Sequence, residues 1–200
     1  MARFTEFDYG ITALTSRFHQ DWTNTGSPRD VLRAYLWEGQ DPRAVEILGR
    51  DAACAGEKMS DEHVETLWTA SVDGGFAFPG SAESGTEWMR AIDAECRLWL
   101  SGKPSPGLSP VDVDPGSAQL TGVLEVIGSL GRYAVDDAVT SALASCARLC
   151  SPELALRFTL RVLSVSDVTI DRELHERISA LGDSLGFGEF LVSDIADLVQ

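Results

Sequence analysis

Residues 86–100, Thr-Glu-Trp-Met-Arg-Ala-Ile-Asp-Ala-Glu-Cys-Arg-Leu-Trp-Leu, show most clearly how this chain folds. Apolar side chains recur there at steps of three and four residues, as they do along the buried face of an α-helix. Those side chains are Trp88, Met89, Ile92, Cys96, Trp99 and Leu100. Thr86 or Ser84, just before the apolar stripe, is suited to begin the helix. The stretch therefore predicts an amphipathic helix packed by one side against a core.

The same periodicity extends in both directions from this helix. Towards the N-terminus it predicts one helix from Ile11 to Trp22, and others that begin at Ser27-Pro28, Asp41-Pro42 and Ser60. A polar residue followed by proline is typical of a helix start, because the side chain caps free N–H groups and proline suits the first helical position. Towards the C-terminus the pattern predicts helices over 118–130, 135–149, 151–163, 171–185 and 189–199. We therefore expect an all-α, multi-helix bundle.

Composition changes sharply at Ser101. Four prolines and three glycines fall between Ser101 and Gly116, with few apolar residues. Such a stretch is typical of a linker or long connecting loop. We expect a helical domain over residues 1–102, a Pro/Gly-rich linker over 103–116 and a C-terminal helical bundle over 117–200.

The chain is strongly acidic. Its 200 residues include 31 Asp and Glu against 16 Lys and Arg, which gives a net charge of −15. A field of that sign repels nucleic acid and anionic membranes and favours basic partners. A role in keeping the protein soluble would explain this net charge equally well.

Several features predict a cytoplasmic protein. No run of about 18 apolar residues that could cross a membrane is present, and the first residues contain no apolar export signal. The four cysteines, Cys54, Cys96, Cys146 and Cys150, show no CxxC pair and no metal-finger spacing. We interpret them as reduced, mostly buried thiols.

The sequence offers little support for catalysis. The three histidines, His19, His63 and His175, fall in no metal-ligand spacing, and no phosphate-binding glycine loop or nucleophile elbow is present. Carboxylate clusters such as Asp136-Asp137 are more often solvated helix faces than acid–base pairs. We therefore expect no catalytic residues, no metal and no cofactor, and a protein that is not an enzyme.

One motif is more specific. The segment Phe18-His19-Gln20-Asp21-Trp22, followed by a polar turn and Ser27-Pro28, resembles the immunity proteins of bacterial contact-dependent growth inhibition systems. Thr86-Glu87-Trp88-Met89 is similar to a second element of that family, and Gly75-Phe76-Ala77-Phe78-Pro79 to the aromatic-proline loop before it. The resemblance covers about the first hundred residues.

The chain departs from the family pattern in two respects. Arg17 stands where an aromatic residue is common, and the C-terminal half lies outside the resemblance. We interpret the motif residues Phe18, His19, Gln20, Asp21, Trp22 and Trp88 mainly as parts of the fold. Phe18 and Trp22, four residues apart, are suited to anchor the core.

The resemblance implies an immunity protein that binds and neutralises a cognate toxin domain. An acidic surface would suit a basic toxin, such as a nuclease, because complementary fields speed encounter. Candidate contacts are the carboxylates of Asp61, Glu62, Glu65, Asp73 and Glu83. The alternative is a non-catalytic helical adaptor or scaffold that binds a cellular complex, and the sequence leaves a homo-oligomer open.

Overall fold

The computed structural model of the chain describes residues 5–73, 84–104, 116–166 and 168–200. Within these ranges the chain forms ten α-helices, several short 3₁₀ helices and no strand. The predicted all-α, multi-helix bundle is confirmed. No helix in the described ranges has the length and apolar character needed to cross a membrane.

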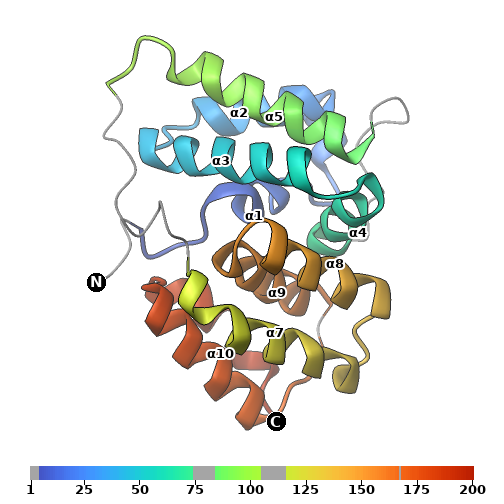
Figure 1. Cartoon of the computed structure of the whole chain (residues 1–200). Coiled ribbons are helices and arrows are strands. Elements are labelled where there is room, and N and C mark those ends of the chain that lie inside the picture. Colours follow the sequence, from blue (N-terminus) through green and yellow to red (C-terminus); the bar gives the residue numbers. More distant parts are fainter. Residues whose placement is uncertain (1–4, 74–83, 105–115, 167) are drawn as a thin grey trace.

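The helices follow one another along the chain. They are α1 (Gly10–Thr15), α2 (Pro28–Trp37), α3 (Pro42–Lys58), α4 (Asp61–Ser71), α5 (Gly85–Leu100), α7 (Leu120–Ser129), α8 (Asp137–Leu149), α9 (Pro152–Ser166), α10 (Arg172–Leu185) and α11 (Glu189–Ser193). Figure 1 shows α2, α3 and α5 in one layer and α7, α8, α9 and α10 in another, with α1 and α4 between them.

The predicted helix starts on the N-terminal side are confirmed in detail. Ser27 and Asp30 form a capping box at the start of α2, with Pro28 at the first helical position. Asp41 caps α3 by accepting from the N–H of Arg43. Ser60 caps α4 in the same way. These starts depend on neighbouring residues only, which is why the sequence reveals them.

The predicted first helix from Ile11 to Trp22 is wrong, because α1 ends at Thr15. The Thr15 hydroxyl donates to the carbonyl of Thr12, and the N–H of Phe18 donates to the carbonyl of Thr15. Hydroxyl donors of this kind compete with the helical hydrogen-bond ladder. The chain therefore turns, and Trp22 begins a separate 3₁₀ helix.

The predicted last helix over 189–199 is also wrong in length. Helix α11 ends at Ser193, and a 3₁₀ turn (Ala196–Leu198) follows. The N–H of Ile170 donates to the carbonyl of Leu198, and Val199 forms an isolated bridge with Ile170. This long-range pairing holds the C-terminal residues in an extended conformation that periodicity does not indicate.

The two halves expected from the sequence share one hydrophobic core. Helix α4 packs against α8 and α9 as well as α5, and α1 packs against α3 and α9. Every residue from Ser151 to Leu160 is buried, so the start of α9 is surrounded on all sides. Most of the expected linker, residues 105–115, lies outside the described residues.

Candidate protein-binding site

A cluster of charged side chains lies buried where the two layers meet. Glu153 and Arg157 come from the first turns of α9, Asp51 comes from α3, and Tyr9 precedes α1. Arg157 is 1% exposed and Glu153 is fully buried. Charged residues are almost never buried so completely without partners, so the contacts of Arg157 decide what the cluster can do.

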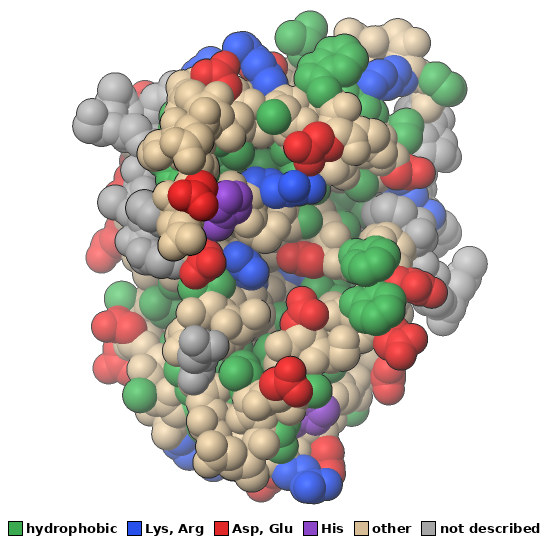
Figure 2. Space-filling view, turned by 180° about the vertical axis from the view of Figure 1, so that it is seen from behind, with side chains coloured by type: hydrophobic (Ala, Val, Ile, Leu, Met, Phe, Trp, Pro, Cys, Tyr) green, Lys and Arg blue, Asp and Glu red, His purple; other side chains and the backbone are tan. Residues whose placement is uncertain are grey.

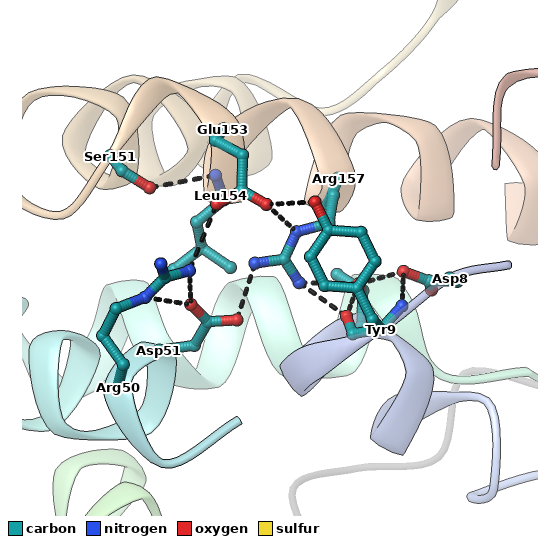
Figure 3. Close-up of polar contacts among 9 residues, drawn as sticks. Asp8, Tyr9, Arg50, Asp51, Ser151, Glu153, Leu154 and Arg157 are labelled. Atoms are coloured by element: carbon teal, nitrogen blue, oxygen red, sulfur yellow. Dashed lines mark hydrogen bonds and ion pairs between the residues drawn. The ribbon is translucent and has the colours of Figure 1, made fainter. Parts of the chain in front are cut away.

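Each of the three nitrogen atoms of the Arg157 guanidinium donates a hydrogen bond. Nε donates to Glu153 Oε1 at 2.7 Å, and Nη2 donates to Asp51 Oδ2 at 2.6 Å. Nη1 donates to the backbone carbonyl of Tyr9 at 2.6 Å. The Tyr9 hydroxyl donates in turn to Glu153 Oε1 at 2.7 Å, and Arg50 bridges both carboxylates from the half-buried edge. Figure 3 shows both carboxylates directed at the guanidinium.

The two arginines and two carboxylates balance in charge. Burial alone would raise the pKa of Asp51, but Arg157 and Arg50 outweigh it and hold this pKa below its ordinary value. The pKa of Arg157 lies well above its ordinary value, because Asp51 and Glu153 outweigh the opposing effect of burial. Asp51 and Arg157 therefore stay ionised at neutral pH. The cluster links the start of α1 to α3 and α9, and its role is to stabilise the fold.

This cluster is not evident from the sequence pattern. A glutamate and an arginine four residues apart are usually an exposed helical ion pair. The available signal was the surrounding run, Leu-Ala-Leu-Arg-Phe-Thr-Leu-Arg-Val-Leu over 154–163, whose apolar residues face every side of a helix. A helix that is apolar all round is buried, and its charged residues then need partners from elsewhere in the chain.

A pocket of about 490 Å³ opens on the outer side of this cluster. Its lining includes Arg17, His19 and Arg161 together with Asp8 and Asp194. Figure 2 shows this face, where basic, acidic and histidine side chains gather around a hollow between the two layers. The pocket therefore presents polar groups of both signs.

Two groups of the pocket are perturbed by burial. Burial raises the pKa of Asp8, although Arg157 and the Thr12 hydroxyl oppose the shift. Burial lowers the pKa of Arg161, whose Nε donates to the backbone carbonyl of Ser71 at 2.9 Å. Perturbed groups that line a pocket are typical of functional sites, although ion networks produce them as well.

The sequence motif divides into a buried and an exposed part. Phe18 is 1% exposed and packs edge-on against Trp68 and Trp88, with ring centroids 5.1 and 6.4 Å away. Trp22 is partly buried and packs against Phe18, with ring centroids 5.5 Å apart. By contrast the three polar residues, His19, Gln20 and Asp21, are exposed, and His19 lies at the pocket. The aromatic residues thus fix the backbone from which these polar side chains project.

Two of the candidate carboxylates already have backbone partners within the fold. Asp61 Oδ1 accepts from the N–H of Thr86 at 2.8 Å, and Glu65 Oε1 accepts from the N–H of Gly85 at 3.0 Å. Both therefore cap the N-terminus of α5 from a neighbouring helix. Glu62 and Asp73 are exposed. Glu83 lies outside the described residues, as does the loop of Phe76 and Phe78.

The thiols occupy positions suited to packing. None of the four cysteines, all within the described ranges, forms a disulfide, and Cys96 and Cys146 are buried. Hydrogen bonding to the Cys150 thiol, together with burial, raises the pKa of Cys54 above its ordinary value. A protonated thiol is a poor nucleophile and metal ligand. Across the described ranges, no group of three or more His, Cys, Asp or Glu residues could hold a metal ion.

Comparison with known proteins adds no name to this geometry. No family model, curated protein or solved structure matches the chain. A functional assignment therefore depends on the motif, the surface and the charge of this chain alone.

Proposed function

We propose that this chain is an immunity protein of a bacterial contact-dependent growth inhibition system, which binds a cognate basic toxin domain in the cytoplasm and neutralises it. One observation carries the proposal. The motif that resembles this family keeps its aromatic residues at least partly buried and presents His19, Gln20 and Asp21 at the surface, and His19 lines the pocket between the layers.

The rigidity of this arrangement supports a role in binding. Phe18, Trp68 and Trp88 contact one another edge-on, and each is at most 2% exposed. A backbone that is already held rigid loses little further conformational freedom when a partner binds. The polar motif residues are therefore placed for a specific contact at low entropic cost.

The charge of the chain supports a basic partner. A net charge of −15 on 200 residues attracts a positively charged surface, such as the substrate groove of a nuclease, from a distance. Complementary fields raise association rates and discriminate against wrong partners. We therefore expect fast association that slows as salt is added, because salt screens the attraction.

Affinity measurement with motif variants tests the proposal. The ligand is the purified product of the neighbouring gene, titrated by calorimetry into the wild-type chain and into the triple variant His19→Ala, Gln20→Ala, Asp21→Ala. We expect nanomolar binding to the wild type and a loss of about tenfold or more in the variant.

The control is the double variant Glu173→Ala, Glu176→Ala, which changes exposed residues of α10. It should retain the wild-type affinity. Absence of any complex with the wild-type chain would remove the immunity proposal and favour the alternative, a helical adaptor for a cellular complex.

A further inference from the structure

Two phenylalanines lie stacked on the outside of the molecule. The rings of Phe7 and Phe190 are nearly parallel, with an angle of 14° and 5.0 Å between centroids. Phe7 is 63% exposed and Phe190 is 42% exposed. Large apolar side chains that are exposed next to one another mark interaction sites more often than isolated ones do.

The stack is held in place by the backbone beneath it. The N–H of Phe190 donates to the carbonyl of Glu6 at 3.1 Å. Gly188 permits this approach, because a Cβ at this position would lie 2.3 Å from the Cα of Glu6. The segment around Phe7 is thereby fixed against the start of α11, and the aromatic pair is part of the folded structure.

Three exposed carboxylates lie near this aromatic pair in the sequence, and one of them, Asp194, lines the same pocket as Phe7. Glu6 and Glu189 each adjoin one of the phenylalanines in sequence, and Asp194 follows Phe190 by four residues at the end of α11. None of these three acidic side chains forms an ion pair within the described ranges. Figure 2 shows apolar and acidic side chains next to each other at the edge of the face with the pocket.

Among the described residues, Trp37 is another strongly exposed aromatic side chain and gives a contrast. Trp37 is 75% exposed, and the ammonium group of Lys103 lies between its ring and that of Trp99, 5.5 and 2.9 Å from the two centroids. No cationic side chain of the described ranges lies over Phe7 or Phe190. The face of this pair is therefore open to a cation from another molecule.

We infer that the aromatic–acidic patch, formed by Glu6, Phe7, Glu189, Phe190 and Asp194, binds a lysine or arginine side chain on a basic segment of a partner protein. The cation lies against the aromatic rings and pairs with the carboxylates of the patch, since an aromatic face and a carboxylate both attract positive charge. The inference rests on the proposed function, in which the partner is a basic toxin domain, and it names where that domain makes contact.

The first test uses a synthetic peptide of alternating lysine and glycine, so that it does not depend on the toxin. We expect the aromatic NMR signals of Phe7 and Phe190 to shift as the peptide is added. Binding should weaken about fivefold or more in the variant Phe7→Ala, Phe190→Ala. The variant Trp37→Ala is the control and should bind as the wild type does. Unchanged Phe7 and Phe190 signals would overturn the inference.

A second pair of variants separates the patch from net charge. Two double variants each remove two negative charges. The first, Glu189→Gln with Asp194→Asn, changes the patch. The second, Glu173→Gln with Glu176→Gln, changes α10 away from the patch. We expect the first to weaken peptide and toxin binding and the second to leave both nearly unchanged. Equal weakening by both double variants would show that the net charge of the protein is responsible, and would overturn the inference that the patch binds the cation.

The toxin domain of the neighbouring gene distinguishes the two proposals. If this domain binds the wild type and the patch variants equally, the proposed function stands and the inferred role of the patch in binding is overturned. If the toxin domain does not bind at all while the peptide binds at Phe7 and Phe190, the patch stands and the proposed function fails.

Discussion

Arg157 connects three segments of the chain that are far apart in sequence. Its guanidinium contacts Tyr9 before α1, Asp51 on α3 and Glu153 on α9. An arginine suits this role because its planar fork donates in several directions and remains charged when buried. The sequence shows the Glu153–Arg157 spacing but cannot show its burial, since the partners Tyr9 and Asp51 are brought to it only by the tertiary fold.

Replacement of Arg157 by methionine tests the importance of the cluster. We expect Arg157→Met to lower the free energy of unfolding by about 3–5 kcal/mol, because two buried carboxylates lose their main partner. Urea denaturation measures this change. The control Arg148→Met, at an exposed position of α8, should change stability by less than about 0.5 kcal/mol. A small effect at Arg157 would mean that Asp51 and Glu153 are hydrated in solution.

Asp8 gives a prediction with a defined dependence on pH. Burial raises the pKa of this carboxyl, so its contribution to stability is full below the ordinary value of 3.8 and is lost as pH rises through the folded-state pKa. The substitution Asp8→Asn keeps a side-chain oxygen for the N–H of Tyr9 and the hydroxyl of Thr12. We expect this variant to be more stable than the wild type at pH 7 in urea denaturation. The advantage should shrink as pH falls, and an advantage that grew instead would contradict the assignment.

At the scale of the elements, helix starts could be read from the sequence and helix ends often could not. Ser27, Asp41 and Ser60 cap the helices that they were predicted to begin, because a cap depends on residues within one turn. The ends of α1 and α11 depend on distant parts of the chain. Phe18 must reach Trp68, and Val199 pairs with Ile170.

Asp61 was predicted as a partner contact, and its position gives a different expectation. Its carboxylate accepts from the N–H of Thr86 at the start of α5, so Asp61→Ala leaves this donor without its acceptor. We expect a loss of about 1 kcal/mol in the free energy of unfolding, as at other helix caps. Thermal denaturation with the neighbouring variant Glu62→Ala as control measures it. Equal stability of the two variants would argue against a capping role.

At the scale of the whole molecule, the two layers depend on each other. Helix α4 contacts α8 and α9, and the ion cluster joins α3 to α9. The change in composition at Ser101 predicts a connection, but it contains no information on whether the halves pack together. The fold class and most helices could therefore be predicted from local pattern, whereas the shared core, the pocket and the aromatic–acidic patch could not.

This shared core predicts the behaviour of a fragment. We expect residues 1–102 alone to show no cooperative thermal unfolding, because α4 would expose its contacts with α8 and α9 and Asp51 would lose Arg157. Circular dichroism during heating, with the full chain as reference, provides the measurement. A sharp transition of the fragment would show that the first half is an independent domain.

The proposed neutralisation of a basic toxin by this chain can be tested in growing cells. The most direct measurement is the growth of cells that produce the toxin domain of the neighbouring gene, with and without this chain. We predict that the intact chain restores growth and that the triple variant of His19, Gln20 and Asp21 restores it less well. Growth arrest that is equally severe with and without the intact chain would contradict the claim.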